Sequence, residues 1–336
     1  MTEFHRSGRR RRGSAVVALL ALALALACRG GQENWPESSA SPAASVPWSP
    51  DDPGFLGIEV CRGCHRIETE HWEATIHARA FLDSPRTARE RLACEACHGP
   101  GAAHLVDPRD STRIVSFTRG SGHPVEVMNA TCLACHAGGS RLHWPGSRHE
   151  GEALACSDCH NPMAAQSERA LLRERDVSRT CFGCHPAQRA EFSKRSHMPL
   201  LEGKIDCADC HQPHGSIEDP LLRADSSFDL CTRCHADKRG PFIWEHAPVT
   251  EGCTSCHLPH GSNRDHLLVT SPPFLCQQCH AQIGVANHPI SLTTPENLAS
   301  GSVPVARDAR AIGRGCVTCH AQIHGSNHPS GARFHR

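Results

Sequence analysis

Apolar residues form one continuous run near the N-terminus of this chain and short, scattered groups elsewhere. The run extends from Ala15 to Ala27, directly after the basic residues Arg9 to Arg12. Its 13 residues are too few to span a bilayer. A basic stretch, a short apolar stretch and the small-residue sequence Ala25-Leu26-Ala27 are the successive parts of a secretory signal peptide. We therefore expect residues 1–27 to be a signal peptide and the mature protein to be exported.

Cys28 follows the expected cleavage site directly, and it is the one cysteine outside the repeated motif described below. This arrangement resembles a bacterial lipoprotein signal, in which the cysteine is lipidated and becomes the mature N-terminus. An ordinary signal-peptidase site beside an incidental cysteine is the alternative. A leftover cysteine in an exported chain favours lipidation, because such a thiol needs an explanation.

The remainder of the chain predicts short elements and no sheet. Residues 28–55 are rich in Pro, Ser, Ala, Glu and Gly, and they predict a flexible tether. Beyond them Gly and Pro interrupt most segments, and alternating β-branched runs are absent. We expect mostly irregular coil with almost no β-strand, and short α-helices such as those over residues 66–81 and 187–197.

Composition shows that an ordinary core is difficult to build. Aromatic residues make up 4% of the 336 residues and Tyr is absent, whereas there are 21 cysteines and 26 histidines. Large aromatic side chains dominate core energetics, so another group must supply apolar volume. Lys+Arg and Asp+Glu number 35 each, which gives no case for nucleic-acid binding. The basic residues are mostly Arg, whose planar fork pairs well with the carboxylates of a bound group, although solvation of the surface explains them equally.

The motif C-x-x-C-H occurs ten times and uses every cysteine except Cys28. Cysteines at i and i+3 lie on one face of a helical turn, where they can bond both vinyl groups of a haem while the adjacent histidine reaches the iron. Zinc sites, thiol redox centres and disulfide scaffolds do not require that histidine after every pair. We expect ten covalent haems c. The predicted attachment residues are Cys61, Cys64, Cys94, Cys97, Cys132, Cys135, Cys156, Cys159, Cys181, Cys184, Cys207, Cys210, Cys231, Cys234, Cys253, Cys256, Cys276, Cys279, Cys316 and Cys319. The predicted proximal ligands are His65, His98, His136, His160, His185, His211, His235, His257, His280 and His320.

Each iron also needs a second axial ligand or an open position, and 16 histidines lie outside the motifs. A histidine three residues after the proximal one lies on the same side of its own haem, so it must reach a neighbouring haem. The predicted distal ligands are His77, His104, His149, His197, His214, His246, His260, His288, His324 and His328. The surplus histidines, for which a surface or hydrogen-bonding role is expected, are His71, His123, His143 and His266.

One motif departs from the others, because Met163 stands where two similar motifs have His214 and His260. Methionine can ligate haem iron and raises its reduction potential. It can also be a packing thioether, which the number of available histidines favours.

Spacing between motifs indicates an array. Most successive motifs begin 22–26 residues apart, with no long apolar run between them, so each repeat is one haem and its wrapping. The expected fold class is a multihaem cytochrome c, an elongated, haem-packed array. Five motifs fall on each side of residue 205, and we expect two pentahaem halves, residues 56–205 and 206–336.

Several longer segments resemble one family of proteins. The decahaem cytochromes c of the MtrA/DmsE family resemble this chain over roughly residues 57–336, most clearly at Cys94-Glu-Ala-Cys97-His98-Gly-Pro, Lys194-Arg-Ser-His197, Lys238-Arg-Gly-Pro, Trp244-Glu-His246-Ala-Pro-Val-Thr and His324-Gly-Ser-Asn-His328-Pro-Ser-Gly. The resemblance implies bis-His haems and an outer-membrane β-barrel porin as a partner. It also implies periplasmic and extracellular redox partners, either cytochromes or a terminal reductase. Met163 departs from the family's usual histidine, and a lipid on Cys28 would add a membrane tether.

Three functions fit these residues. The near match between spare histidines and motifs favours an electron conduit with no catalytic residues, and the resemblance implies a location on the periplasmic side of the outer membrane. A freely diffusing periplasmic electron shuttle would have the same motifs but no barrel partner. A multihaem reductase needs an open iron position, commonly marked by an altered proximal residue, and every motif here keeps its histidine.

Overall fold

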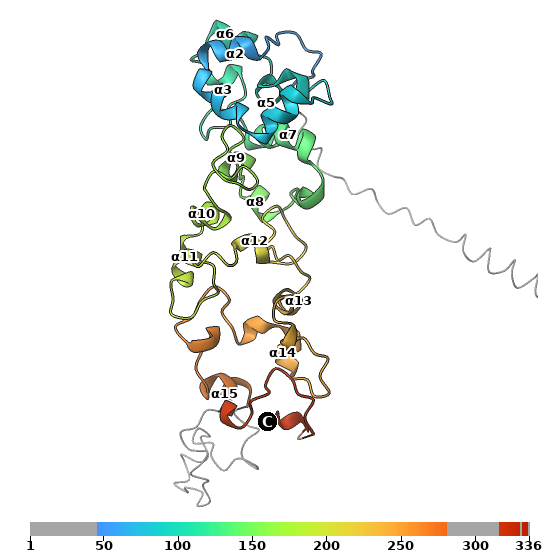
Figure 1. The fold of residues 1–336 in the computed structure, drawn as a ribbon, viewed down its shortest axis with the longest axis vertical. Coiled ribbons are helices and arrows are strands. Elements are labelled where there is room, and N and C mark those ends of the chain that lie inside the picture. The colour runs from blue at the N-terminus through green and yellow to red at the C-terminus, as the bar shows by residue number, and fades with distance from the viewer. Residues whose placement is uncertain (1–45, 281–315, 330, 335–336) are drawn as a thin grey trace, which may run out of the picture. The chain divides into compact units, whose positions relative to one another are not determined.

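The computed structural model describes residues 46–280, 316–329 and 331–334. All of these residues belong to one unit, Ala44–Arg336, so the division at residue 205 stays a prediction. The signal peptide, Cys28, most of the tether and His288 lie outside the described residues. Figure 1 shows that the described unit consists of short helices joined by coil.

The first part of the unit carries its longest helix, α7, which has 12 residues. The elements labelled α are α-helices. Those labelled η are 3-10 helices, except η1, which is a π-helix. In chain order the first elements are α2 (Ile58–Cys64), α3 (Arg66–Glu73), α4 (Ile76–Ala78), η1 (Arg79–Asp83), η2 (Glu90–Leu92), α5 (Glu95–His98), α6 (Ala102–Val106), η3 (Ser111–Arg113) and α7 (Val125–His136).

Helices in the remainder of the unit have seven residues or fewer. They are η4 (Gly139–Arg141), α8 (Arg148–Gly151), α9 (Cys156–Cys159), α10 (Val177–Phe182), α11 (Pro186–Phe192), α12 (Cys207–Cys210), α13 (Ser227–Thr232), η5 (Ala236–Lys238), α14 (Ala247–Glu251), η6 (Cys253–Ser255), η7 (Asp265–Leu267), α15 (Phe274–His280), η8 (Cys316–Thr318) and η9 (Gly331–Arg333).

Both helices predicted individually are shorter in the structure. The expected helix over residues 66–81 is wrong as a single element. Thr75 adopts an extended conformation, and its side chain caps the new helix α4 by accepting a hydrogen bond from the Ala78 N–H. The expected helix over residues 187–197 ends at Phe192. Its last predicted residues instead approach another motif, since Ser196 forms an antiparallel bridge with Ser262.

Strand pairing in the described residues is limited to isolated bridges, as expected. These bridges are His160 with Leu172, Ser196 with Ser262, His211 with Leu222, Trp244 with Ser326 and His257 with Leu268. Each joins a motif either to its own following loop or to a segment near a predicted distal histidine. The bridges therefore fix where the histidines lie.

Buried apolar side chains are sparse for a unit of this length. Within the described ranges, the large ones are Trp48, Trp72, Met128, Trp144, Leu172, Phe192 and Leu200. One cluster joins Trp72, Ala78 and Ala93, with Phe81 and Met163 packed against it. The described residues contain no helix that is long and apolar enough to cross a membrane.

Candidate haem-binding sites

Three motifs share one local fold that fixes the orientation of the proximal histidine. In each, the Nδ1 atom of that histidine lies within hydrogen-bonding distance of a backbone carbonyl in the following loop. The pairs are His160 with Ala170 at 2.8 Å, His211 with Pro220 at 2.9 Å and His257 with His266 at 2.7 Å. A proton on Nδ1 donated to a carbonyl leaves Nε2 as the metal-binding nitrogen.

The loop returns to the motif through a second set of bonds. The residue after each proximal histidine donates its backbone N–H to a leucine carbonyl: Asn161 to Leu171 at 2.6 Å, Gln212 to Leu221 at 2.7 Å and Leu258 to Leu267 at 2.7 Å. These leucines have φ values of 49°, 60° and 59°, a region that side chains other than glycine rarely adopt. The local hydrogen bonds hold this strained backbone in place, which is common at functional sites.

Seven proximal histidines have a predicted distal histidine opposite them in the described structure. The pairs, with the distance between ring centroids, are His65–His104 at 6.2 Å, His136–His77 at 5.9 Å, His160–His214 at 6.0 Å, His185–His149 at 6.3 Å, His211–His260 at 6.1 Å, His257–His324 at 6.2 Å and His280–His246 at 6.2 Å. A histidine three residues after a proximal one does reach another motif: His214 and His260 each lie against the motif two places earlier.

This separation fits one iron between two imidazoles. A metal–imidazole bond of about 2.0 Å, with roughly 1.1 Å from that nitrogen to the ring centre, places two axial ring centres about 6.2 Å apart. The observed pairs span 5.9 to 6.3 Å. The distal histidines have their own second contacts, since Nδ1 of His149 lies 2.7 Å from the Pro213 carbonyl and Nδ1 of His246 lies 3.0 Å from the Ile323 carbonyl. These paired residues therefore fit bis-His haem.

Burial favours the neutral, metal-binding form of these rings. Burial, with the nearby His160 ring as a second cause, lowers the pKa of His214 to about 4. Burial also lowers the pKa of His77, which lies beside His136. The buried Nδ1 atoms of both distal rings have no hydrogen-bond partner among protein atoms.

Cysteines of consecutive motifs lie close enough for their thiols to interact. The first cysteines of motifs meet in the pairs Cys61–Cys94, Cys132–Cys156, Cys181–Cys207, Cys231–Cys253 and Cys276–Cys316. The second cysteines lie near enough to influence one another electrostatically in the pairs Cys97–Cys135, Cys159–Cys184, Cys210–Cys234 and Cys256–Cys279. These two types of pair alternate along the chain and place each motif beside the next. The ten attachment sites therefore form an unbroken series.

Two proximal histidines have no second histidine ring at this separation in the described part of the chain. The His98 ring packs edge-on against Phe117, with centroids 5.3 Å apart, and His235 is exposed. The predicted ligand His197 turns its Nε2 to Glu202, 3.0 Å away, while its Nδ1 lies 2.7 Å from the Lys194 carbonyl.

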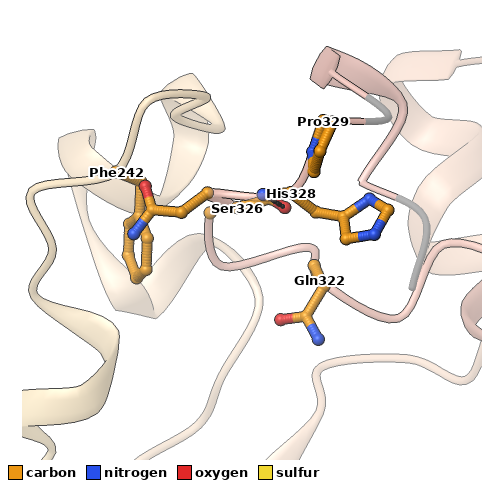
Figure 2. Close-up of a pocket in the computed structure, with 7 residues that line it drawn as sticks. Phe242, Gln322, Ser326, His328 and Pro329 are labelled. Carbon is orange, nitrogen blue, oxygen red and sulfur yellow. Dashed lines mark hydrogen bonds between the residues drawn. The ribbon is translucent and has the colours of Figure 1, made fainter.

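The last motif has two predicted distal candidates, His288 and His328. His288 lies outside the described residues. His328 lines a cavity of about 400 Å³ with Phe242, Gln322 and Ser326. Figure 2 shows the His328 ring pointing away from Phe242. The proximal His320 has its Nδ1 against the carbonyl of Arg333, the same type of contact as in the earlier motifs.

A second cavity, of about 350 Å³, lies beside the second motif and is lined by His98, Trp48, Val115 and His123. Sequence reasoning assigned His123 a hydrogen-bonding role. Its Nε2 lies 2.9 Å from the Ile114 carbonyl and 3.1 Å from the Ser111 carbonyl. The position of His123 beside His98 had no signal in the sequence, because His123 does not closely follow a motif.

Comparison with known proteins agrees with these sites. Residues 148–190, 197–240 and 246–284 match the family described as "Doubled CXXCH motif". The multiheme cytochrome MtrA of Shewanella baltica is 41% identical over 232 residues, which are 69% of this chain and 68% of that protein. The C-type polyheme cytochrome OmcB of Geobacter sulfurreducens is 24% identical over 265 residues, covering 66% of this chain and 30% of that protein. The high-molecular-weight cytochrome c of Nitratidesulfovibrio vulgaris is 23% identical over 146 residues, covering 43% of this chain and 24% of that protein.

Proposed function

Because the chain belongs to the MtrA family of multihaem cytochromes, we propose that it is a decahaem electron conduit across the outer membrane. It is a c-type cytochrome that binds haem covalently, and it transfers electrons rather than converting a substrate. In the proposal it lies inside a β-barrel porin and connects periplasmic with extracellular redox partners. The proposed position is the periplasmic side of the outer membrane, after export by the signal peptide over residues 1–27.

The observation that carries this proposal is the closeness of cysteines in every two consecutive motifs, with pairs of first cysteines alternating with pairs of second cysteines. When bound, haem supplies a one-electron carrier at each motif. The closeness of the cysteines would place neighbouring haems side by side, and the paired histidines would occupy both axial positions. A site with both positions filled by the protein favours electron transfer over substrate binding.

We propose that the pattern of ring pairs extends to the motif of His235. His77, His149 and His246 each lie between two consecutive motifs and face the proximal histidine of the second motif after them, namely His136, His185 and His280. His197 lies between the fifth and sixth motifs, so the same relation assigns it to His235 in the seventh. We include this pair in the proposal, with Glu202 releasing Nε2 of His197 when haem is attached.

Lipidation of Cys28 is a further part of the proposal. A lipid at this position would tether the N-terminus to the membrane through the segment over residues 28–55. Mass spectrometry of the mature N-terminus is the direct test. A free cysteine or a cleavage site elsewhere would contradict lipidation without affecting the conduit.

Proteoliposomes test the conduit. The protein is reconstituted with the β-barrel that co-purifies with it, and reduction of an enclosed dye by an external donor is followed. Native protein should reduce the dye. A variant with Cys231→Ala and Cys234→Ala, which lacks one attachment site within the series, should do so at least tenfold more slowly, whereas His71→Ala serves as an exposed-residue control. The proposal would be contradicted if the native protein transferred no electrons to the dye, or if the double variant transferred them as fast as the native protein.

The same preparation distinguishes the conduit from the alternative function. A freely diffusing shuttle would exchange electrons with soluble cytochromes. No barrel would co-purify with it, and the enclosed dye would stay oxidised. The double variant also needs a haem count by mass spectrometry, which should show one haem fewer than the native protein.

A further inference from the structure

Four tight turns in the chain are equivalent. In each, the backbone N–H of the fourth residue donates to the carbonyl of the first: Ala164 to Asn161 at 3.3 Å, Gly215 to Gln212 at 3.0 Å, Gly261 to Leu258 at 3.1 Å and Gly325 to Gln322 at 3.0 Å. The third position of these turns holds Met163, His214, His260 and His324, respectively. The first turn therefore presents a methionine at a position where the other three present a histidine.

The three histidines obey one rule. His214 faces His160, His260 faces His211 and His324 faces His257. In each case the turn follows one motif, and its histidine meets the proximal histidine two motifs earlier. The turn of Met163 follows the fourth motif, so the same rule directs Met163 to His98 in the second motif.

Packing around the first turn supports the same assignment independently. Gly215 approaches the carbonyl of His143, which precedes the distal ligand His149 by six residues. Gly261 approaches Glu191, which precedes His197 by the same number. Met163 packs against the cluster of Trp72, Ala78 and Ala93.

That cluster corresponds to His143 and Glu191 at the other turns, because it too includes a residue that shortly precedes a distal ligand. Trp72 and Ala78 flank the distal ligand His77, and Ala93 directly precedes Cys94 of the second motif. Met163 therefore packs against a cluster that adjoins the second motif, to which the rule directs it. Ala164 replaces the glycine of the other turns and carries a Cβ, so the backbones cannot approach as closely there. An unbranched thioether side chain adapts to such a gap.

The second motif has a proximal ligand without a histidine partner. Nδ1 of His98 lies 2.7 Å from the Val115 carbonyl, which leaves Nε2 for iron. Within the described residues no other histidine ring lies at the separation seen in the seven pairs. His123 lines the same cavity, but its Nε2 is directed at the carbonyls of Ser111 and Ile114 and acts there as a donor.

We infer that Met163 is the sixth ligand of the iron at the second motif, opposite His98. The inference rests on haem occupying the motifs, as in the proposed function. A His/Met iron has a higher reduction potential than a bis-His iron. The second site is then the position in the series where an electron is held most strongly, near one end of the row of attachment sites.

Near-infrared magnetic circular dichroism of the fully oxidised native protein tests this ligand set, because His/Met and bis-His ferric haem have separate charge-transfer bands. The expected spectrum contains one His/Met haem among the bis-His haems. Met163→Leu should abolish the His/Met band, and Met163→His should convert that haem to bis-His. Met128→Leu, which removes another buried methionine, should leave the band unchanged. Intact mass confirms that every variant carries the same number of haems.

Two results would overturn the assignment: a native spectrum with bis-His bands alone, or a His/Met band that persists in Met163→Leu. A native bis-His spectrum that changes in His123→Gln would identify His123 as the ligand instead. A redox titration supplies a second readout, since Met163→His should remove the highest-potential component. Neither measurement depends on a barrel or on transmembrane transfer, so the inference and the conduit can fail separately.

Discussion

His214 faces His160 across a gap of 6.0 Å between ring centroids, with only 17° between the ring planes. The two residues come from the sixth and fourth motifs, respectively. Their separation is the one that a shared iron requires. Each such pair therefore binds two distant motifs together as well as completing a site, so loss of a distal histidine should affect both the iron and the fold.

Replacement of His214 by alanine should open one axial position. We expect one haem to change from low-spin to high-spin in the ferric state, because no other side chain of the turn can reach the iron. The high-spin signal in electron paramagnetic resonance measures the effect. His71→Ala, an exposed surplus histidine, is the control and should remain fully low-spin. An unchanged low-spin count in His214→Ala would remove His214 from the ligand set.

Gly261 should tolerate no side chain. An added Cβ would lie 2.0 Å from the carbonyl oxygen of Glu191, and the residue has a φ of +153°. Since that contact is with backbone, Gly261→Ala should destabilise the protein by about 2 kcal/mol or more. The shift in the midpoint of denaturant unfolding measures the loss. Gly138→Ala, where nothing lies within 4 Å of the added Cβ, should unfold like the native protein.

Glu95 should hold the start of the described unit in place. Its buried carboxylate accepts backbone N–H bonds from Leu56, Gly57 and Gly101 at 2.8 to 3.0 Å. Hydrogen bonds to a charged group contribute about 1.5–3 kcal/mol, so Glu95→Ala should cost about 3 kcal/mol in the free energy of unfolding. Limited proteolysis should then cut near residue 56. Equal protease resistance in Glu95→Ala and the exposed control Glu168→Ala would contradict this role.

Haem removal should abolish cooperative folding. The described residues bury few large apolar side chains, and the cluster around Trp72 contains only small residues besides it. Such a chain cannot offset its conformational entropy without a further apolar group. Polypeptide produced without the haem attachment machinery should therefore lack a cooperative thermal transition in circular dichroism. A sharp transition in the haem-free chain would show that the polypeptide alone makes a sufficient core.

Sequence reasoning located the motifs and the short coil-linked helices, because both depend on residues close together in the chain. It also predicted that His214 and His260 leave their own motifs, since the side of the haem plane is set by local spacing. It could not predict which motif each histidine reaches. That choice depends on bridges such as Ser196 with Ser262, which join segments far apart in sequence.

The helix predictions failed where such distant contacts override local preference. The pattern after Ala187 continues as a helix, yet the chain leaves it at Phe192 to pair with the loop of another motif. The missing partner of His98 was also invisible in a simple count of histidines, because ten candidates equalled ten motifs. Only the positions of the turns indicate that Met163 belongs to that set.

Because the two types of cysteine pair alternate, motifs at odd and even positions in the series are not equivalent. Each motif pairs its first cysteine with the first cysteine of one neighbour, as in Cys132 with Cys156, and a pair of second cysteines lies toward the other neighbour, as in Cys159 with Cys184. Deleting one motif would oppose a first cysteine to a second one, and would also misdirect histidines that reach two motifs along the chain. Deleting two consecutive motifs preserves both relations. We therefore expect arrays of this type to gain or lose motifs in pairs, the unit that the doubled-motif family model also describes.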